Sequence, residues 1–281
     1  MRSKLFVPAS RPELFDKAMA SAADAISFDL EDAVAPGSKA SARSCLAEWL
    51  AASGRAEILE QHAKKIIVRV NAVDSPHFAA DLAALARLPI DMLNVPKTES
   101  AAAVQHAIQA ATEAGFGGEF LVNVETPAGL AHAAELASAH ARVAGLQLGL
   151  ADLCEPLGIQ RYQPQTLHTL MLSLRLAAGT AGKFAMDAAY ARVTDAEGFR
   201  AEAQLARSLG FLGKSCIHPS QIAIANQVFG FTEAEIAAAQ RIVAASRARP
   251  AMGAFLLDGK MIDAPFVQRA QDVLRATGRC A

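Results

Sequence analysis

Cysteine is scarce in this chain, and the four residues of this type follow no recognisable pattern. Cys45, Cys154, Cys216 and Cys280 are scattered, without a C-x-x-C pair and without a spacing typical of zinc sites. The pattern therefore suggests neither a disulfide framework nor a zinc centre. We expect reduced thiols, as is usual for a cytoplasmic protein.

The chain also lacks an excess of charge of either sign, and it lacks long apolar runs. The formal net charge is −1, and no block of like charges interrupts the sequence, so we expect no nucleic-acid partner and no anionic membrane surface as a partner. No segment approaches the roughly 20 apolar residues of a membrane helix, and the apolar run near the amino terminus is too short for a secretory signal. We expect a soluble protein in the cytoplasm.

Several well-known catalytic and cofactor-binding motifs are missing as well. No expected strand is followed by the glycine-rich fingerprint of dinucleotide-binding folds. The sequence has no G-x-S-x-G motif and no cysteine and histidine placed for nucleophilic catalysis. What it has is 52% hydrophobic and only 20% charged residues, which is ample for a sizeable core.

Eight short apolar runs alternate with amphipathic segments along the first 230 residues. The expected strands are Leu5–Pro8, Ala25–Leu30, Lys65–Val70, Met92–Val95, Phe120–Glu125, Leu146–Leu150, Lys183–Met186 and Ser215–Ile217. The expected helices are Ser38–Ala52, Ser75–Leu88, Ser100–Ala114, Pro127–Ala139, Gln165–Ala178, Asp195–Leu209 and Pro219–Val228. Strands that alternate with helices are parallel, and eight such units predict an α/β fold of the (β/α)₈ TIM barrel type. An open doubly wound sheet is the alternative, against which the missing glycine fingerprint argues.

The remaining residues follow after the eight strands and helices are complete. We expect a helix over Thr232–Ala248, a break at Pro250–Gly253, a polar insert D-G-K-M-I-D and a last helix that ends near Thr277. The predicted domains are therefore a barrel, residues 1–230, and a C-terminal helical extension, residues 231–281. An extension of this kind tends to dock on a neighbouring subunit or to cap one end of the barrel, and we expect it at a subunit interface.

Two carboxylates directly follow buried strands. Glu125 ends the run F-L-V-N-V, with Thr126 and Pro127 behind it as a helix N-cap and first helical residue. Asp152 follows the next strand in the same way. Because the carboxyl ends of barrel strands share one face, the pair predicts a site for a hard cation such as Mg²⁺. Either acid alone could instead be a first-turn acid that interacts with the helix dipole.

Other polar residues follow the remaining strands. They are Asp29, Glu31, Asp32, Arg69, Asn71, Lys97, Asp187, Lys214 and His218. If all lie on one rim, a metal site faces an anion-binding arginine, which suits a small carboxylate or keto acid. Arg69 in an apolar strand is costly unless it is paired, which favours a functional or bridging role. Alternation predicts that Glu31 and Asp32 face opposite ways, and that one acid of this trio binds a basic neighbour or a metal-bound water.

These segments, taken in order, resemble one known family. They are R-S-K-L-F-V-P from Arg2, F-D-L-E-D-A-V from Phe28, R-V-N from Arg69, V-P-K from Val95, V-E-T-P-A-G-L from Val124, G-L-A-D-L from Gly149, G-F-L-G-K-S-C-I-H-P-S-Q from Gly210 and D-G-K-M-I-D-A-P from Asp258. Together they are similar to the citrate lyase β-subunit family of the HpcH/HpaI aldolase superfamily, which also contains malyl-CoA and citramalyl-CoA lyases. The match runs nearly from end to end, and it does not specify one substrate.

The resemblance implies a role for individual residues. The family's two Mg²⁺ carboxylates fall on Glu125 and Asp152. Its substrate-binding arginine falls on Arg69, and Glu125 is expected to contact the substrate as well. Its acid/base aspartate, which a neighbouring subunit's tail donates, falls on Asp263. Phe6 and Pro8 would lie along the CoA. Members are (β/α)₈ barrels that form trimers or hexamers.

The chain departs from many relatives at two places. Ala9 and Ser10 replace a glycine followed by an acidic residue or asparagine, which affects the CoA contacts, and L-C-E-P-L-G-I-Q-R-Y after Asp152 suggests a different acyl group. The implied function is a Mg²⁺-dependent carbon–carbon lyase that cleaves a malyl-CoA or citramalyl-CoA type thioester to a 2-keto acid and acetyl-CoA. The alternatives are a citrate lyase β subunit acting on a carrier-protein thioester, a CoA-independent keto-acid aldolase, and a non-catalytic barrel that binds a keto acid or CoA.

Overall fold

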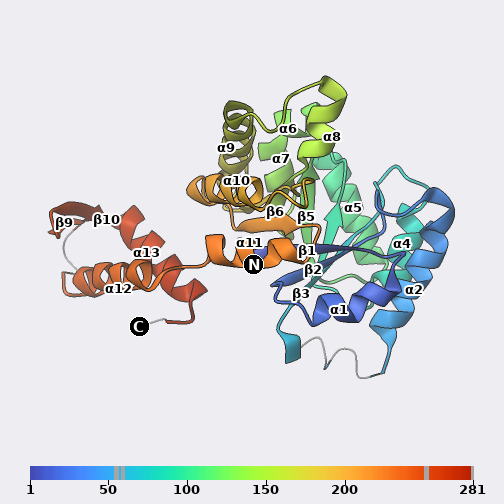
Figure 1. Cartoon of the computed structure of the whole chain (residues 1–281), viewed down its shortest axis with the longest axis horizontal. Coiled ribbons are helices and arrows are strands. Elements are labelled where there is room, and N and C mark those ends of the chain that lie inside the picture. The colour runs from blue at the N-terminus through green and yellow to red at the C-terminus, as the bar shows by residue number, and fades with distance from the viewer. Residues whose placement is uncertain (54–56, 58–60, 250–252, 280–281) are drawn as a thin grey trace. The chain divides into compact units, whose positions relative to one another are not determined.

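The computed structural model describes residues 1–53, 57, 61–249 and 253–279, which form two compact units, Met1–Phe229 and Gly230–Ala281 (Figure 1). Cys280 and the first three residues of the expected break, from Pro250 onward, lie outside the described residues. Cys45, Cys154 and Cys216 are free thiols. In the described part of the chain, no helix is both long and apolar enough to cross a membrane.

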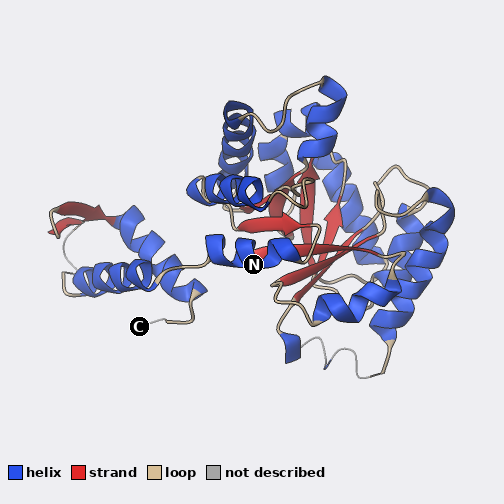
Figure 2. Cartoon of the chain, viewed as in Figure 1, coloured by secondary structure: helices blue, strands red, loops and turns tan. Residues whose placement is uncertain are grey.

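The first unit is a closed barrel of eight parallel strands in sequence order (Figure 2). The strands are β1 (Ser3–Pro8), β2 (Ala25–Asp29), β3 (Lys65–Arg69), β4 (Met92–Val95), β5 (Glu119–Val124), β6 (Val143–Leu148), β7 (Phe184–Asp187) and β8 (Gly213–Cys216). β8 pairs with β1, in the register Ser3 to Lys214, and closes the barrel. The TIM-barrel expectation is confirmed.

Helices connect and surround the strands of this unit (Figure 2). They are α1 (Phe15–Met19), α2 (Lys39–Ala51), α4 (Phe78–Leu85), α5 (Ala101–Glu113), α6 (Pro127–Ala131), α7 (Ala133–Ser138), α8 (Leu150–Cys154), α9 (Pro164–Thr180), α10 (Ala196–Ser208) and α11 (Ser220–Phe229). Their starts follow from local chemistry, because Ser100, Thr126 and Asp195 each accept a backbone N–H of the first turn. The single helix expected over Pro127–Ala139 is two helices that meet at His132.

Alternation along the strands separates two apolar layers. In β3, Ile66 and Val68 belong to the large core that includes the surrounding helices, whereas Ile67 joins Ala25 and Met92 in a small separate cluster. Because successive strand residues point to opposite faces, this second cluster lies inside the barrel. The apolar plug supports the strands, while their carboxyl ends remain available for polar groups.

The second unit has its own apolar core. Helix α12 (Glu233–Arg247) packs on α13 (Ala264–Ala276) through Ile236, Ala239, Val243, Ala270, Val273 and Leu274. Between them, the segment expected to be only a polar insert is a hairpin of β9 (Ala254–Leu257) and β10 (Lys260–Asp263). Asp258 and Gly259 turn it with φ of 49° and 77°, the left-handed pair typical of a two-residue hairpin loop.

Candidate active site

A cavity of about 510 Å³ opens at the carboxyl ends of the barrel strands. Five residues that the sequence assigns to the site line it, namely Phe6, Pro8, Arg69, Glu125 and Asp152. They come from β1, β3 and the segments that follow β5 and β6. The fold therefore gathers at one end of the barrel residues that are up to 146 positions apart, from Phe6 to Asp152.

Glu125 is a buried carboxylate that forms no side-chain salt bridge with any residue that the structure describes. Its side chain is only 3% exposed, and its two oxygens accept hydrogen bonds from Lys97 N at 2.7 Å and Asn123 Nδ2 at 3.2 Å. Burial raises the pKa of Glu125 to about 7, although the nearby charge of Arg69 lowers it. Within the described residues no lysine or arginine side chain bonds it, so its charge is free to bind a cation.

Two backbone features fix the position of this carboxylate. Lys97, whose N–H donates to it, has a left-handed backbone with φ of 51°, which is uncommon for a residue with a side chain. On the other side, a Cβ on Gly149 would lie 2.4 Å from Glu125 Cβ and 2.6 Å from Oε2. Glycine is therefore required at the end of β6 if Glu125 is to keep this position.

Asp152, in the first turn of α8, lines the same cavity as Glu125. The two acids are close enough for the charge of Asp152 to raise the pKa of Glu125. Among the described residues no three His, Cys, Asp or Glu side chains gather around one point. Two carboxylates completed by water and substrate oxygens are the usual Mg²⁺ arrangement, so the residues present fit this ion.

Arg69 is held by acids of β2 and the turn behind it. Its Nε and Nη2 bond the two oxygens of Asp29 at 2.8 and 2.6 Å, and its Nη1 lies 3.0 Å from Glu31. Burial lowers the pKa of Arg69, but the hydrogen bonds and charge of Asp29 outweigh it, so the pKa is raised. Its guanidinium also lies 5.2 Å from the ring of Phe6. The expected pairing of this strand arginine is present.

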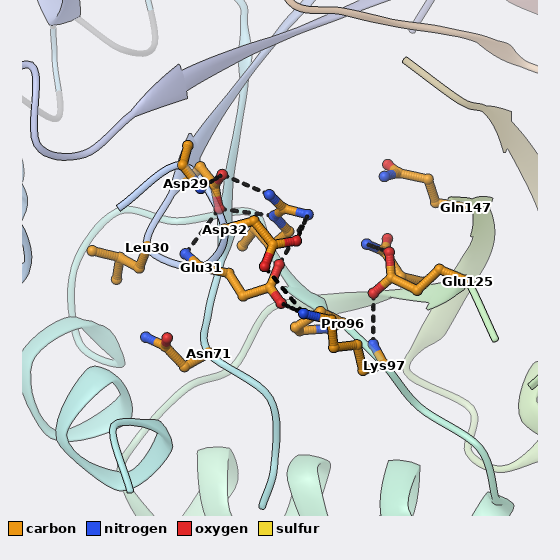
Figure 3. A network of polar contacts seen from close by, with 12 residues as sticks. Asp29, Leu30, Glu31, Asp32, Asn71, Pro96, Lys97, Glu125 and Gln147 are labelled. Carbon is orange, nitrogen blue, oxygen red and sulfur yellow. Dashed lines mark hydrogen bonds and ion pairs between the residues drawn. The ribbon is translucent and has the colours of Figure 1, made fainter. Parts of the chain in front are cut away.

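The expectation that Glu31 and Asp32 face opposite ways is wrong. Lys97 Nζ lies 2.6 Å from Glu31 and 3.1 Å from Asp32 (Figure 3). Since Asp29 and Glu31 bind Arg69, all three acids contact a basic side chain, and not one alone. The physical reason is that β2 ends at Asp29 and the chain then turns, with Val34 N bonded to Glu31 O, so strand alternation no longer applies.

Three residues expected on the rim lie elsewhere. Lys214 bonds Asp187 at 2.6 Å and Glu202 of α10 at 2.7 Å, in a fully buried cluster on the helix side of β7 and β8. Asn71 donates to Asp81, at the start of α4, through both its backbone and its side chain. None of the three, Asp187, Lys214 and Asn71, lines the cavity. The same is true of His218, which is exposed and whose Nδ1 bonds Ser220 Oγ at 2.8 Å.

Asp263 belongs to the second unit, where it ends β10 and precedes α13. Its Oδ1 is buried and has no hydrogen-bond partner within the described residues. The side chain does not cap α13, although it stands at the N-cap position. This acid is therefore not committed to the helix start, the usual structural use of an aspartate there.

Sequence reasoning missed three polar residues that line the cavity: Asn123, Gln147 and Arg161. Asn123 and Gln147 pair in register on β5 and β6, one layer deeper than Glu125 and Gly149. Period-two alternation counted back from those two residues would have found them. Arg161 follows α8 on a loop, and no spacing signal marks it.

Comparison with known proteins agrees with this geometry. The family model described as HpcH/HpaI aldolase/citrate lyase matches residues 2–219. The chain is 34% identical to the citrate lyase subunit beta of Leuconostoc mesenteroides subsp. cremoris, over 98% of this chain and 92% of that protein. It is 33% identical to an L-malyl-CoA/beta-methylmalyl-CoA lyase of Cereibacter sphaeroides, over 98% of this chain and 93% of that protein.

A solved structure is similar over the whole chain. The protein CitE of Mycobacterium tuberculosis, in complex with magnesium, acetoacetate and coenzyme A, is 34% identical and superposes with a TM-score of 0.78, covering 99% of this chain and 100% of that one. The matched family region includes the barrel strands and the acids at their ends. The chain belongs to the HpcH/HpaI aldolase/citrate lyase family.

Proposed function

We propose that this protein is a Mg²⁺-dependent carbon–carbon lyase that cleaves a 3-hydroxyacyl-CoA thioester of malyl-CoA or citramalyl-CoA type. The products would be a 2-keto acid and acetyl-CoA. The observation that carries the proposal is the buried carboxylate of Glu125, which has no salt bridge in the described part of the chain and shares the cavity with Asp152 and Arg69. The family match and the relatives named as acyl-CoA and citrate lyases support it.

Glu125 and Asp152 are the residues that would hold Mg²⁺. When bound, the ion supplies Lewis-acid polarisation of a substrate oxygen and neutralises developing negative charge. Lys97 N–H and Asn123 Nδ2 orient the Glu125 carboxylate for this task, and Gly149 leaves it room. The burial that raises the pKa of Glu125 also makes a bound cation more favourable there.

Arg69 would bind the substrate carboxylate in the cavity that it lines together with Glu125 and Asp152. Asp29 fixes its guanidinium plane through two hydrogen bonds, so little side-chain entropy is lost when a substrate arrives. The preorganised charge then stabilises negative charge that develops as the carbon–carbon bond breaks. In that step the substrate hydroxyl would give its proton to solvent and its oxygen would become the keto oxygen of the 2-keto acid. The electron pair of the broken carbon–carbon bond would pass to the thioester half as an enolate.

Asp263 would protonate this enolate, or in reverse abstract a proton from acetyl-CoA. Its Oδ1 is buried and has no hydrogen-bond partner among the residues described, which supports a task for this side chain other than a structural one. We propose that it acts on a neighbouring copy, so that residues 1–230 are the catalytic barrel and residues 231–281 the extension at the interface of a homotrimer or hexamer. Phe6 and Pro8, which line the cavity, would lie along the CoA. The proposal includes a cytoplasmic location, in keeping with the expected reduced thiols.

The test measures products from malyl-CoA and citramalyl-CoA, with Mg²⁺ and with a chelator. We expect acetyl-CoA and glyoxylate or pyruvate only when Mg²⁺ is present. Asp263→Asn should keep the fold and Mg²⁺ affinity and lose turnover, whereas Asp258→Asn in the exposed hairpin turn is the matched control with normal turnover. Mixing Asp263→Asn with Glu125→Gln subunits, each of which should be nearly inactive alone, should restore part of the activity if the aspartate acts across the interface.

The alternatives predict different results in the same assay. A citrate lyase β subunit would need the carrier-protein thioester, and a keto-acid aldolase would cleave free 4-hydroxy-2-keto acids without CoA. Release of malate and free CoA would identify thioester hydrolysis and contradict a lyase. Binding of keto acid and CoA without any turnover, in a protein that retains Glu125, Asp152, Arg69 and Asp263, would indicate a non-catalytic barrel.

A further inference from the structure

Two positively charged side chains line the cavity, and they differ in how well they are paired. Among the described lining residues, Arg69 and Arg161 are the cations. All three nitrogens of Arg69 lie within 3.0 Å of oxygens of Asp29 and Glu31. Arg161 is only 4% exposed, and a buried cation normally has its charge and its N–H groups satisfied in the same way. Arg161 is an exception to this rule.

The guanidinium of Arg161 keeps a donor without a partner. Its Nη2 donates to the backbone oxygen of Ala189 at 3.0 Å, and Ala189 lines the same cavity. Its Nε is buried and has no hydrogen-bond partner within the described residues. Because a buried donor without a partner is unfavourable, a ligand oxygen that accepts from this guanidinium would be bound strongly.

The acid beside Arg161 is bonded more closely to another cation. Glu202 Oε1 lies 3.5 Å from Arg161 Nη2, whereas Lys214 Nζ bonds the same oxygen at 2.7 Å. Hydrogen bonds between charged groups are typically about 2.7–2.9 Å long, so Lys214 is the main counter-ion of Glu202. The positive charge of Arg161 is therefore available to an anion in the cavity.

An aromatic ring supports this guanidinium without using its N–H groups. The centroid of the Tyr162 ring lies 4.7 Å from Arg161 Cζ, and the Tyr162 ring packs edge-on against Tyr190. Stacking on an aromatic ring fixes the guanidinium plane and leaves its donors unused. A charge that is fixed before the substrate arrives can stabilise negative charge with little reorganisation.

The proposed function, on which this step rests, places negative charge at two positions of the substrate. One is the carboxylate of the keto-acid half, which Arg69 would bind. The other is the thioester oxygen, because the electron pair of the broken carbon–carbon bond moves to the thioester half and its charge is delocalised onto that oxygen. Of the two arginines that line the cavity, Arg161 is the one to which no anion has been assigned.

We propose that Arg161 is a catalytic residue that donates an N–H hydrogen bond to the thioester oxygen and stabilises the enolate formed in this step. The oxygen carries only a partial charge in the thioester and gains charge as the bond breaks, so the contact strengthens toward the transition state. Arg161→Gln should lower kcat by about 10²–10³-fold, the effect of removing one donor to an oxyanion. The affinity for pyruvate should stay as in the wild type.

A second experiment tests the assignment without turnover. It measures, by calorimetry, the binding of two CoA analogues to the full-length protein in the presence of Mg²⁺ and pyruvate. In both analogues a methylene group replaces the thioester sulfur. One ends in a carboxylate, which carries the charge of the enolate, and the other ends in a neutral carboxamide of the same size. We expect the wild type to bind the carboxylate analogue at least about 10-fold more tightly, the factor of one hydrogen bond to a charged group. Arg161→Gln should lose most of this ratio.

Arg192→Gln is the matched control. Arg192 also lies over the Tyr162 ring, at 3.9 Å, but it is exposed and does not line the cavity. The variant should keep the wild-type ratio, since any contact with the CoA part affects both analogues alike. Equal binding of the two analogues by the wild type, or an unchanged ratio in Arg161→Gln, would overturn the proposal.

Two further results separate this proposal from folding defects and from the proposed function. Should Arg161→Gln fail to fold, Arg161→Lys decides: one ammonium cannot bond Ala189 and also present a planar fork, so the ratio should fall, and an unchanged ratio overturns the assignment. A ratio that depends on Arg161 in a protein without lyase activity refutes the proposed reaction but not the site for the charged oxygen. A working lyase whose ratio is independent of Arg161 does the reverse.

Discussion

Two clusters of charged side chains lie against the barrel strands, and they differ in whether they are closed. On the helix side of β7 and β8, Lys214 is fully buried and bonds both Asp187 and Glu202. At the cavity, Arg69 and Lys97 bond the acids of β2 and the turn after it, but Glu125, which lines the same cavity, has no salt bridge with any described residue. The closed cluster stabilises the fold, and its Glu202 also lies 3.5 Å from Arg161, whereas the open cluster keeps an anionic group available for a ligand.

We expect the largest effect, a loss of stability, from removing the lysine of the closed cluster. Lys214→Met leaves the buried Asp187 without its cation and Glu202 with Arg161 alone, at 3.5 Å. Removal of one partner of a buried ion pair costs about 3–5 kcal/mol of the free energy of unfolding. Urea unfolding measures it. Lys65→Met removes a lysine from the exposed ion pair with Asp91 and should cost no more than about 1 kcal/mol. Equal losses in the two variants would contradict the comparison.

Removing the open charge should act on catalysis and not on the fold. Glu125→Gln keeps the shape and the contacts with Lys97 and Asn123 but loses the charge proposed to bind Mg²⁺. We expect turnover to fall by at least about 10²–10³-fold, the scale of a lost electrostatic group in an active site, and Mg²⁺ affinity to fall with it. Calorimetric titration with Mg²⁺ and the acetyl-CoA assay measure both. Unchanged Mg²⁺ affinity would remove Glu125 from the metal site.

The pH dependence of stability should reveal the same carboxylate. In chelator, folded Glu125 keeps its proton up to about pH 7, while its ordinary pKa is 4.5, so the folded state binds more protons between these values. Stability should therefore fall as pH rises from about 4.5 to 7, by at most about 3 kcal/mol. Glu125→Gln should lack this component, and saturating Mg²⁺ should offset it at pH 7 and above. A wild-type curve identical to that of the variant would show that Glu125 is not buried as described.

We expect the smallest effect, a loss of keto-acid affinity, from substitution of Arg69. Arg69→Lys preserves a positive charge but cannot bond both oxygens of Asp29 or present a planar fork to a carboxylate. We expect glyoxylate or pyruvate to bind about 10-fold more weakly, the loss of roughly one hydrogen bond to a charged group. Arg2→Lys, at an exposed pair with Asp24, should leave keto-acid affinity as it is. An unaltered affinity in Arg69→Lys would remove Arg69 from the substrate site.

Much of the fold could be predicted because strands and helices carry local signals. All eight barrel strands lie within a few residues of the expected runs, and the caps at Ser100, Thr126 and Asp195 mark real helix starts. The hairpin of the second unit was not predicted, because only a polar insert D-G-K-M-I-D was expected there, although the Asp258–Gly259 pair within it is a strong turn signal.

The sequence alone could not predict whether the polar side chain at each strand end points into the cavity or toward the surrounding helices. Glu31 and Asp32 follow a turn and not a strand, so both reach Lys97. Lys214 lies between two inward positions and therefore faces α10, where Glu202 was too far away in sequence to be recognised as its partner. Gln147 was overlooked because its hydrogen-bond partner, Lys4, is 143 positions away in the sequence. Only the closed barrel brings the two side chains together.

Gly149 has a consequence for reading related sequences. The Glu125 side chain occupies the space that a side chain at position 149 would need. The glutamate after one strand therefore requires a glycine after the next. A homologue with alanine or a larger residue at the second position must have moved or replaced the first. In surveys of uncharacterised barrels of this type, the joint presence of both residues is a stricter criterion for an intact ion site than the acids alone.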